Sequence, residues 1–102
     1  MKLVLGCDHG GLAIRQALLP FLQTHGINVC DLGTFDASPS DYPDFAIEAA
    51  EQLVEGRADA GILICTTGVG MVIAANRFAG VRAALCESVA TAVKTRTHNN
   101  AN

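Results

Sequence analysis

Charged residues are scarce in this sequence. Asp, Glu, Lys and Arg make up 17% of the 102 residues, and they sum to a net charge of −3 without forming a basic stripe. This balance argues against nucleic acid or an anionic membrane as the main partner. Long apolar runs are also missing, because runs such as Ala60–Cys65 are strand-sized and far shorter than the roughly 20 residues that span a bilayer. No signal-peptide pattern opens the chain.

The cysteines lack any Cys-x-x-Cys pair. Cys7, Cys30, Cys65 and Cys86 each lie in or at the end of an apolar, strand-like run. Two disulfides are possible in principle, but this placement favours buried free thiols in a cytoplasmic protein. Because the cysteines are unpaired and the three histidines are scattered, we expect no structural zinc and assign no metal.

Apolar residues dominate what is present. Half of the chain is hydrophobic, which suits a compact core, and 102 residues predict one domain over residues 1–102. Strand-like runs alternate with segments of helical periodicity. The expected strands are Lys2–Cys7, Ile27–Leu32, Ala60–Cys65 and Val81–Cys86; the expected helices are Leu12–His25, a segment from about Pro43 to a stop at Gly56, Met71–Phe78 and Glu87–Thr97.

This alternation predicts βαβ units and a parallel sheet with helices on both faces. The fold class is therefore α/β, a three-layer α/β/α sandwich with a Rossmann-like sheet. Two local details are expected as well. Pro20 lies inside the first helix and predicts a kink, while Asp41 and Pro43 suit the N-cap and the first turn of the second helix.

Polar residues follow two of the expected strands. Asp8 and His9 come after the first strand, and Cys65 begins the segment after the third. Ligands of parallel sheets bind beyond the carboxyl ends of the strands, so these residues are predicted to share one rim. Asp8 and His9 could equally be a helix cap and a surface imidazole or a pair of functional groups, and the rim shared with Cys65 favours a functional role. His25 fits a cation at a helix C-terminus, and His98 taken alone fits a surface residue.

The turn from Thr66 to Gly70 is rich in small residues. Converging backbone amides at a helix start can hold a phosphate or an oxyanion. The turn is neither a Walker loop nor a complete G-x-G-x-x-G fingerprint, and a tight strand-to-helix connection explains the glycines equally well. Cys65 immediately precedes it, where a thiol is more readily deprotonated than in free solution. A base on carbon beside donors for an enediolate oxygen would suit an enolisation.

Several motifs together resemble one family, the ribose-5-phosphate isomerase B type of the ribose/galactose isomerases. The resemblance is collinear over the whole sequence. The motifs are GCDHGG at Gly6–Gly11, DLGT at Asp31–Thr34, DYPDFA at Asp41–Ala46, GILICTTGVG at Gly61–Gly70, AANRFAGVRAAL at Ala74–Leu85 and RTHNNAN at Arg96–Asn102.

The resemblance implies a cofactor-free interconversion of ribose 5-phosphate and ribulose 5-phosphate, a step of the pentose phosphate pathway, through a cis-enediol(ate). Cys65 falls on the family's catalytic base, in the branch that uses Cys. Thr67 and the amides of Gly68, Val69 and Gly70 fall on its anion hole.

Further roles follow from the same resemblance. His98 matches the group that opens the furanose ring, assisted by Asp8. His9 matches a phosphate contact, and Tyr42 and Asn99 lie along the sugar. The family forms dimers or tetramers with the active site shared between subunits. An obligate homodimer is therefore expected, with His98 and Asn99 reaching the neighbouring subunit's Cys65.

Two departures from the family pattern stand out. Thr66 replaces the Gly that many relatives have after the catalytic Cys, and it still offers a backbone amide to the binding turn. The sequence also stops at Asn102, whereas relatives continue into a fifth strand inside the sheet and into C-terminal helices with phosphate-binding arginines. We therefore expect a C-terminally truncated form of the domain with part of its sheet unpaired.

Other functions stay open at this stage. One alternative is an isomerase of allose 6-phosphate or galactose 6-phosphate, because pocket length cannot be inferred from one sequence. A second is a non-catalytic module that binds a phosphosugar or a nucleotide, and a third is an inactive fragment of the isomerase.

Overall fold

The computed structural model describes residues 1–102. Three strands alternate with three α-helices and a fourth α-helix follows, with a short 3₁₀ turn after the first strand. Their bounds are β1 Lys2–Cys7, η1 His9–Gly11, α1 Leu12–Thr24, β2 Asn28–Gly33, α2 Tyr42–Val54, β3 Ala60–Ile64, α3 Val69–Ala75 and α4 Val89–Thr97.

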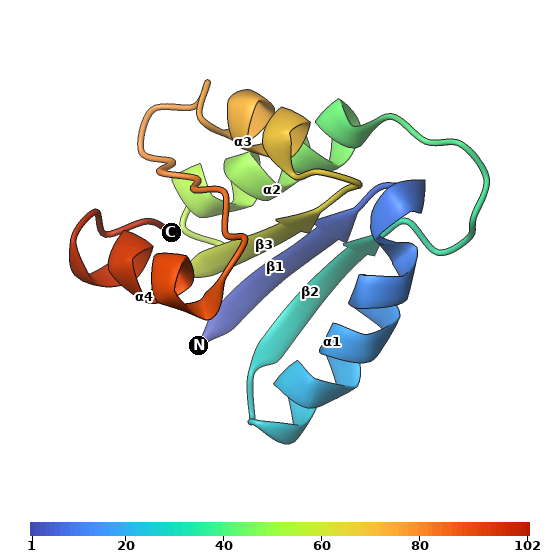
Figure 1. The fold of residues 1–102 in the computed structure, drawn as a ribbon, viewed down its shortest axis with the longest axis horizontal. Coiled ribbons are helices and arrows are strands. Elements are labelled where there is room, and N and C mark those ends of the chain that lie inside the picture. The colour runs from blue at the N-terminus through green and yellow to red at the C-terminus, as the bar shows by residue number, and fades with distance from the viewer.

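The sheet is parallel, with the strand order β2-β1-β3 (Figure 1). Val4 of the central strand pairs with Cys30 of β2 and with Gly61 of β3. Because β1 has a strand on each side and helices on both faces, every residue from Leu3 to Cys7 is buried. This explains why the strand reads as a continuous apolar run rather than an alternating one.

Helices cover both faces of the sheet. Alternate residues of β1 face opposite sides, so Leu5 and Cys7 pack with Leu22 of α1, while Val4 packs with Ala49 of α2. α3 lies against α2 on the second side (Figure 1). The predicted three-layer α/β/α fold class is confirmed.

Gly11 joins β1 to α1 at a point of close approach. A Cβ on Gly11 would lie 2.7 Å from the carbonyl oxygen of Ile64 and 2.9 Å from Cys7 Cβ, so backbone would have to move. We predict that Gly11→Ala lowers the free energy of unfolding by about 3 kcal/mol, the upper part of the range for overpacking. Gly61→Ala is the control, because its Cβ would keep 3.2 Å from a Val4 methyl group. Urea unfolding would contradict the prediction if both variants lost equal stability.

The segment Val81–Cys86 is not a strand, so the prediction of a fourth strand was wrong. No strand lies beside it to form a ladder. Side chains bond its backbone instead: Asn76 bonds both the N–H and the carbonyl of Ala83, and Asn102 Oδ1 accepts the N–H of Arg82. An apolar run becomes a strand only where a neighbouring strand pairs with it.

A groove of about 750 Å³ runs along the free edge of β3. β3, α4 and the segment Val81–Cys86 contribute to its largely apolar walls. Asn102 links β3 to the segment Val81–Cys86. Its carbonyl accepts the N–H of Gly61, and its own N–H donates to Arg82 O. The expectation that a further strand belongs inside this sheet stays a prediction, and the groove is compatible with it.

Smaller details differ from the sequence-based expectations. α3 begins two residues earlier than predicted and ends at Ala75 rather than Phe78. α1 continues through Pro20 as one helix. Asp41 occupies the N-cap position of α2, but its side chain makes no capping hydrogen bond.

The four cysteines are free, as predicted, but only Cys7 is buried. Cys65 is half-buried, and Cys30 and Cys86 are exposed. Both exposures follow from missing neighbours, since Cys30 lies on the edge strand β2 and Cys86 ends the unpaired segment after α3. None of the helices is long and apolar enough to cross a membrane.

Candidate active site

Two turns meet at the carboxyl end of the sheet, as the strand order requires. The N–H of Asp8, after β1, donates to the carbonyl of Ile64 at the end of β3, with 3.2 Å between N and O. Gly10 lies directly against Thr66, because a Cβ on Gly10 would overlap Thr66 Oγ1. The turn after β1 and the turn after β3 therefore form one rim, as predicted from their place in the sequence.

Cys65 lies at the start of the second turn and is half-buried. Its Sγ accepts the N–H of Gly68 at 3.1 Å. Gly68 has φ +82°, a backbone conformation that residues with side chains rarely adopt, and this curls the turn back onto the sulfur. A directed N–H donor of this kind stabilises negative charge on the atom that accepts it.

The amides of the turn divide into engaged and free groups. Gly68 N–H is bonded to the sulfur, and Val69 N–H donates to Thr67 Oγ1 at 3.2 Å. The amides of Gly70 and Met71, in the first turn of α3, make no hydrogen bond within the chain. The amides of Thr66 and Thr67 are free as well, so only Gly68 and Val69 of the expected amides are engaged, and Met71 was not foreseen.

Tyr42 reaches the same rim from the start of α2. Its ring lies on Gly70, where a Cβ would come within 2.5 Å of Tyr42 Cζ. The absence of a side chain at Gly70 therefore lets an aromatic ring pack against the turn that carries Cys65. Tyr42 is 39% exposed, so part of the residue remains accessible at the rim.

Asp8 caps the 3₁₀ turn that follows β1. Its Oδ1 accepts the N–H of Gly10 at 2.9 Å, and the residue is only 7% exposed. The interpretation as a cap is confirmed, and the carboxylate also lies on the rim beside Thr66. His9 is exposed, as expected, but it is held in place. Ser40, in the loop between β2 and α2, bonds both its ring and its backbone.

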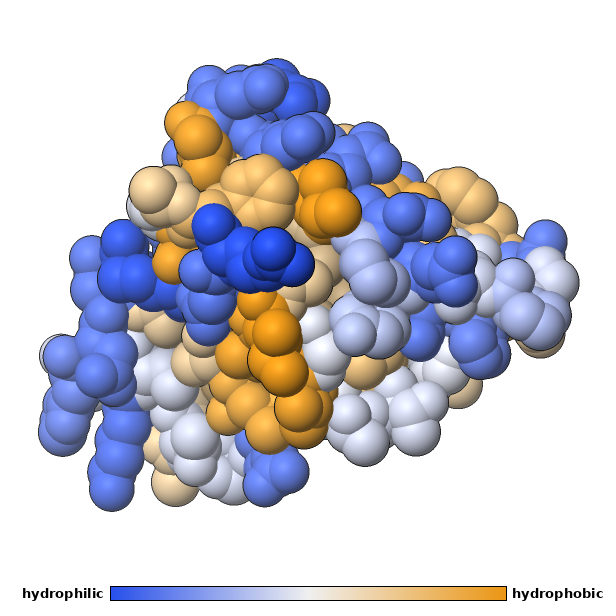
Figure 2. Space-filling view, turned by 90° about the horizontal axis from the view of Figure 1, so that it is seen from above, coloured by the Kyte–Doolittle hydropathy of each residue, from blue (hydrophilic) through white to orange (hydrophobic).

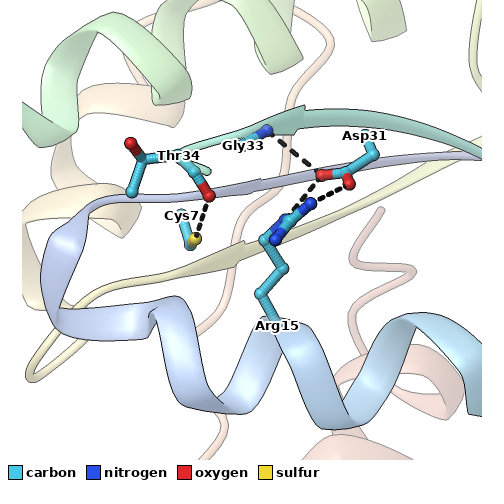
Figure 3. Close-up of polar contacts among 5 residues, drawn as sticks. All are labelled: Cys7, Arg15, Asp31, Gly33 and Thr34. Atoms are coloured by element: carbon cyan, nitrogen blue, oxygen red, sulfur yellow. Dashed lines mark hydrogen bonds and ion pairs between the residues drawn. The ribbon is translucent and has the colours of Figure 1, made fainter. Parts of the chain in front are cut away.

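An ion pair joins α1 to the last part of the edge strand β2 (Figure 3). Arg15 of α1 bonds both carboxylate oxygens of Asp31, which also accepts the N–H of Gly33. Next to it, Thr34 N–H donates to Cys7 O at 2.6 Å, and the Cys7 thiol faces Thr34 O. Burial raises the pKa of the Cys7 thiol, which argues against a nucleophilic role for it.

The pH dependence of this ion pair has a definite sign. The hydrogen bond from Arg15 holds the pKa of Asp31 below its ordinary value. As the pH falls below about 4, the unfolded chain binds a proton first, so the stabilisation that is present above that pH is lost as the pH drops through the folded-state pKa.

We predict that Asp31→Asn lowers the free energy of unfolding by about 3 kcal/mol at neutral pH, because Arg15 stays buried without its partner. The variant should also show a weaker loss of stability in acid than the parent. Urea unfolding across this pH range measures both effects, with Glu51→Gln on the exposed face of α2 as the control. The prediction would be contradicted if the free energy of unfolding of Asp31→Asn and that of the parent fell equally as the pH was lowered.

His98 and Asn99 are not at this rim. They follow α4, whose last turn is tied to the chain end through the bond from Ala101 N–H to Thr95 O. Asn102 in turn bonds Gly61 near the start of β3, at the opposite end of that strand from Cys65 (Figure 1). One chain therefore brings together Asp8, His9, Tyr42, Cys65, Thr66, Thr67, Gly68, Val69 and Gly70, and leaves His98 and Asn99 apart.

Comparison with known proteins decides the family. The profile described as Ribose/Galactose Isomerase matches residues 3–102. The chain belongs to the ribose/galactose isomerase family. It is an isomerase of that family, as the resemblance of its motifs implied. No group of three His, Cys, Asp or Glu side chains is arranged to hold a metal ion.

Individual relatives agree with the family assignment over nearly all of the chain. Ribose-5-phosphate isomerase B of Escherichia coli is 43% identical over 101 residues, which are 99% of this chain and 68% of that protein. The structure of ribose-5-phosphate isomerase B from Clostridium thermocellum superimposes with a TM-score of 0.97 at 44% identity, covering 100% of this chain and 69% of that one. The Mycoplasma genitalium enzyme, solved with bound ribulose-5-phosphate, gives 0.90 at 44% identity, covering 99% and 68%.

The sequence analysis missed three groups that the geometry brings to this site. Ser40 clasps His9, Met71 offers a free amide, and Arg15 anchors the end of β2 through Asp31. Each of these contacts joins segments far apart in the chain or depends on which amides other groups occupy. The one local signal for Ser40 was its position two residues before Tyr42, which was expected at the site.

Proposed function

We propose that this isomerase interconverts ribose 5-phosphate and ribulose 5-phosphate through a cis-enediolate, with Cys65 as the base. The observation that carries the proposal is the hydrogen bond from Gly68 N–H to Cys65 Sγ at a rim shared with Asp8 and Tyr42. It places a sulfur atom that accepts a backbone N–H beside unoccupied backbone donors. The names of the relatives point to the same substrate.

The proton balance is simple. The Cys65 thiolate removes the proton from C2 of the open-chain aldose, and the C2 electrons form the C1–C2 double bond as negative charge develops on O1. Transfer of the O2 hydroxyl proton to O1 and return of the sulfur-bound proton to C1 then give the ketose. No electron leaves the substrate, so the reaction needs no redox cofactor.

The developing negative charge on oxygen needs donors that are already in place. The amides of Gly70 and Met71 and the hydroxyl of Thr67 are the groups we assign to it. Such fixed donors lower the barrier because they require no reorganisation during the reaction. Thr66, whose hydroxyl group lies against Gly10, would narrow the entrance between the two turns.

The remaining roles follow the family resemblance. We assign His9 to the phosphate group and Tyr42 to the sugar. Furanose ring opening is assigned to His98, assisted by Asp8, and Asn99 is assigned to the sugar. Because His98 and Asn99 are remote from Cys65 in one chain, the proposal requires that a second copy supply them.

An apolar stripe supports a self-associated form. Figure 2 looks onto the face that carries α2 and α3, and apolar surface runs through its middle. Ile73 is 63% exposed, Val69 47% and Ile47 41%, all on these two helices. Uncovered apolar area of this kind marks an interface, so we propose a homodimer as the basic unit. Its free cysteines favour the reducing environment of the cytoplasm.

Exchange of the C2 proton tests the proposal directly. Ribose 5-phosphate incubated with the protein in deuterated water should lose its C2 proton signal and yield ribulose 5-phosphate. Binding detected by calorimetry without exchange would instead favour a non-catalytic phosphosugar-binding module. The family description names galactose as well as ribose. Comparison of kcat/KM for ribose 5-phosphate, allose 6-phosphate and galactose 6-phosphate therefore decides between pentose and hexose substrates.

A further inference from the structure

Two hydrogen bonds join His9 to Ser40 in the loop between β2 and α2, and we call this pair of bonds the clasp. His9 N–H donates to Ser40 Oγ at 3.0 Å, and Ser40 N–H donates to His9 Nδ1 at 3.1 Å. The two residues are 31 positions apart. Two bonds of opposite direction between the same pair fix both the backbone and the ring of His9 relative to the loop.

The second bond also determines which ring nitrogen carries the proton. An imidazole nitrogen that accepts an N–H has its lone pair in the bond, so Nδ1 is unprotonated. In the neutral ring the proton is then on Nε2, which makes no hydrogen bond within the chain. The free nitrogen of His9 is consequently an N–H donor, which is the polarity that a phosphate oxygen requires.

We infer that Ser40 is a positioning residue that holds His9 as an Nε2–H donor for the phosphate group of the substrate. The inference rests on the proposed function for the identity of the ligand but not for the geometry of the clasp. Ser38 offers a matched comparison, because it lies in the same loop and bonds only Asp36.

Nuclear magnetic resonance tests the clasp without reference to activity. An N–H···N hydrogen bond transmits a scalar coupling between its two nitrogens, so the Ser40 amide nitrogen and His9 Nδ1 should be coupled in the parent protein. The coupling should persist in Ser38→Ala and weaken in Ser40→Ala, because loss of the hydroxyl that accepts the His9 N–H removes one of the two contacts that align the Ser40 amide with Nδ1. A folded parent protein with assigned signals and no coupling, or with the proton on Nδ1, would overturn the inference.

Kinetics and phosphate binding test the consequence. Loss of one hydrogen-bonded contact that orients a ligand is worth about fivefold in affinity. Ser40→Ala should therefore raise KM for ribose 5-phosphate and Kd for inorganic phosphate by about fivefold with kcat nearly unchanged, as expected for lost uniform binding. Ser40→Thr should restore both values, and Ser38→Ala should leave them at the parent level.

Failure of the inference and failure of the proposed function give different results. An inactive parent protein that shows the coupling and the fivefold change in phosphate Kd would support the role of Ser40 while refuting the isomerase reaction on this substrate. Equal KM and Kd values in Ser40→Ala and the parent would refute the positioning role, whatever the activity.

Discussion

Replacing Cys65 by Ser should reduce the turnover of ribose 5-phosphate by about a thousandfold or more while leaving the fold unchanged. A general base contributes between a hundredfold and ten-thousandfold, and a serine hydroxyl at neutral pH is not a base. Cys65 is half-buried and belongs to none of the hydrophobic core clusters, so the exchange of sulfur for oxygen should have little effect on the free energy of unfolding. Cys65→Ala should behave in the same way.

A cysteine elsewhere in the chain serves as the control for this prediction. Cys30 is exposed and lies on the edge strand β2, so Cys30→Ser should keep the activity of the parent. The rate of C2 proton exchange, measured beside circular dichroism and urea unfolding, separates loss of chemistry from loss of structure. Cys65→Ser with more than a tenth of the parent's exchange rate would remove Cys65 from the role of base.

The parts of this molecule that were predictable from sequence are those with a local cause. Leu3 to Cys7 form a continuous apolar run because β1 is enclosed by two strands and two helix layers. The polar residues after β1 and β3 had to meet, because the carboxyl ends of parallel strands share one edge. The sequence therefore predicted the shared rim on which Asp8 and Cys65 lie.

The parts that could not be predicted depend on contacts between distant segments. Val81–Cys86 has the composition of a strand but no neighbouring strand, and Asn76 and Asn102 bond its backbone instead. The pairing of Ser40 with His9 leaves no periodic trace in the sequence. Which amides of the binding turn stay free could not be predicted either, because the sequence does not reveal that Gly68 N–H is already bonded to Cys65.

The remoteness of His98 from Cys65 leads to the second large prediction, which concerns mixed subunits. Cys65→Ala and His98→Ala should each be nearly inactive alone. If each site combines Cys65 of one subunit with His98 of the other, a dimer of the two variants contains one fully intact site and one doubly defective site. Unfolding a 1:1 mixture and refolding it together gives mixed dimers as about half of the population, so activity should return to roughly a quarter of the parent level.

The alternative arrangement gives the opposite result, which makes the experiment decisive. If Cys65 and His98 of the same subunit met in one site, each site of a mixed dimer would lack one of the two groups, and no activity would return. A co-refolded mixture of Cys65→Ala and Cys65→Ser is the matched control, since no combination of these subunits restores the base. Sedimentation of the refolded mixture shows whether dimers formed. Dimers without recovered exchange would mean that a group other than the partner's His98 opens the ring. His98 of the same subunit is too far away, because the chain end after α4 bonds the start of β3 and Cys65 follows the end of that strand.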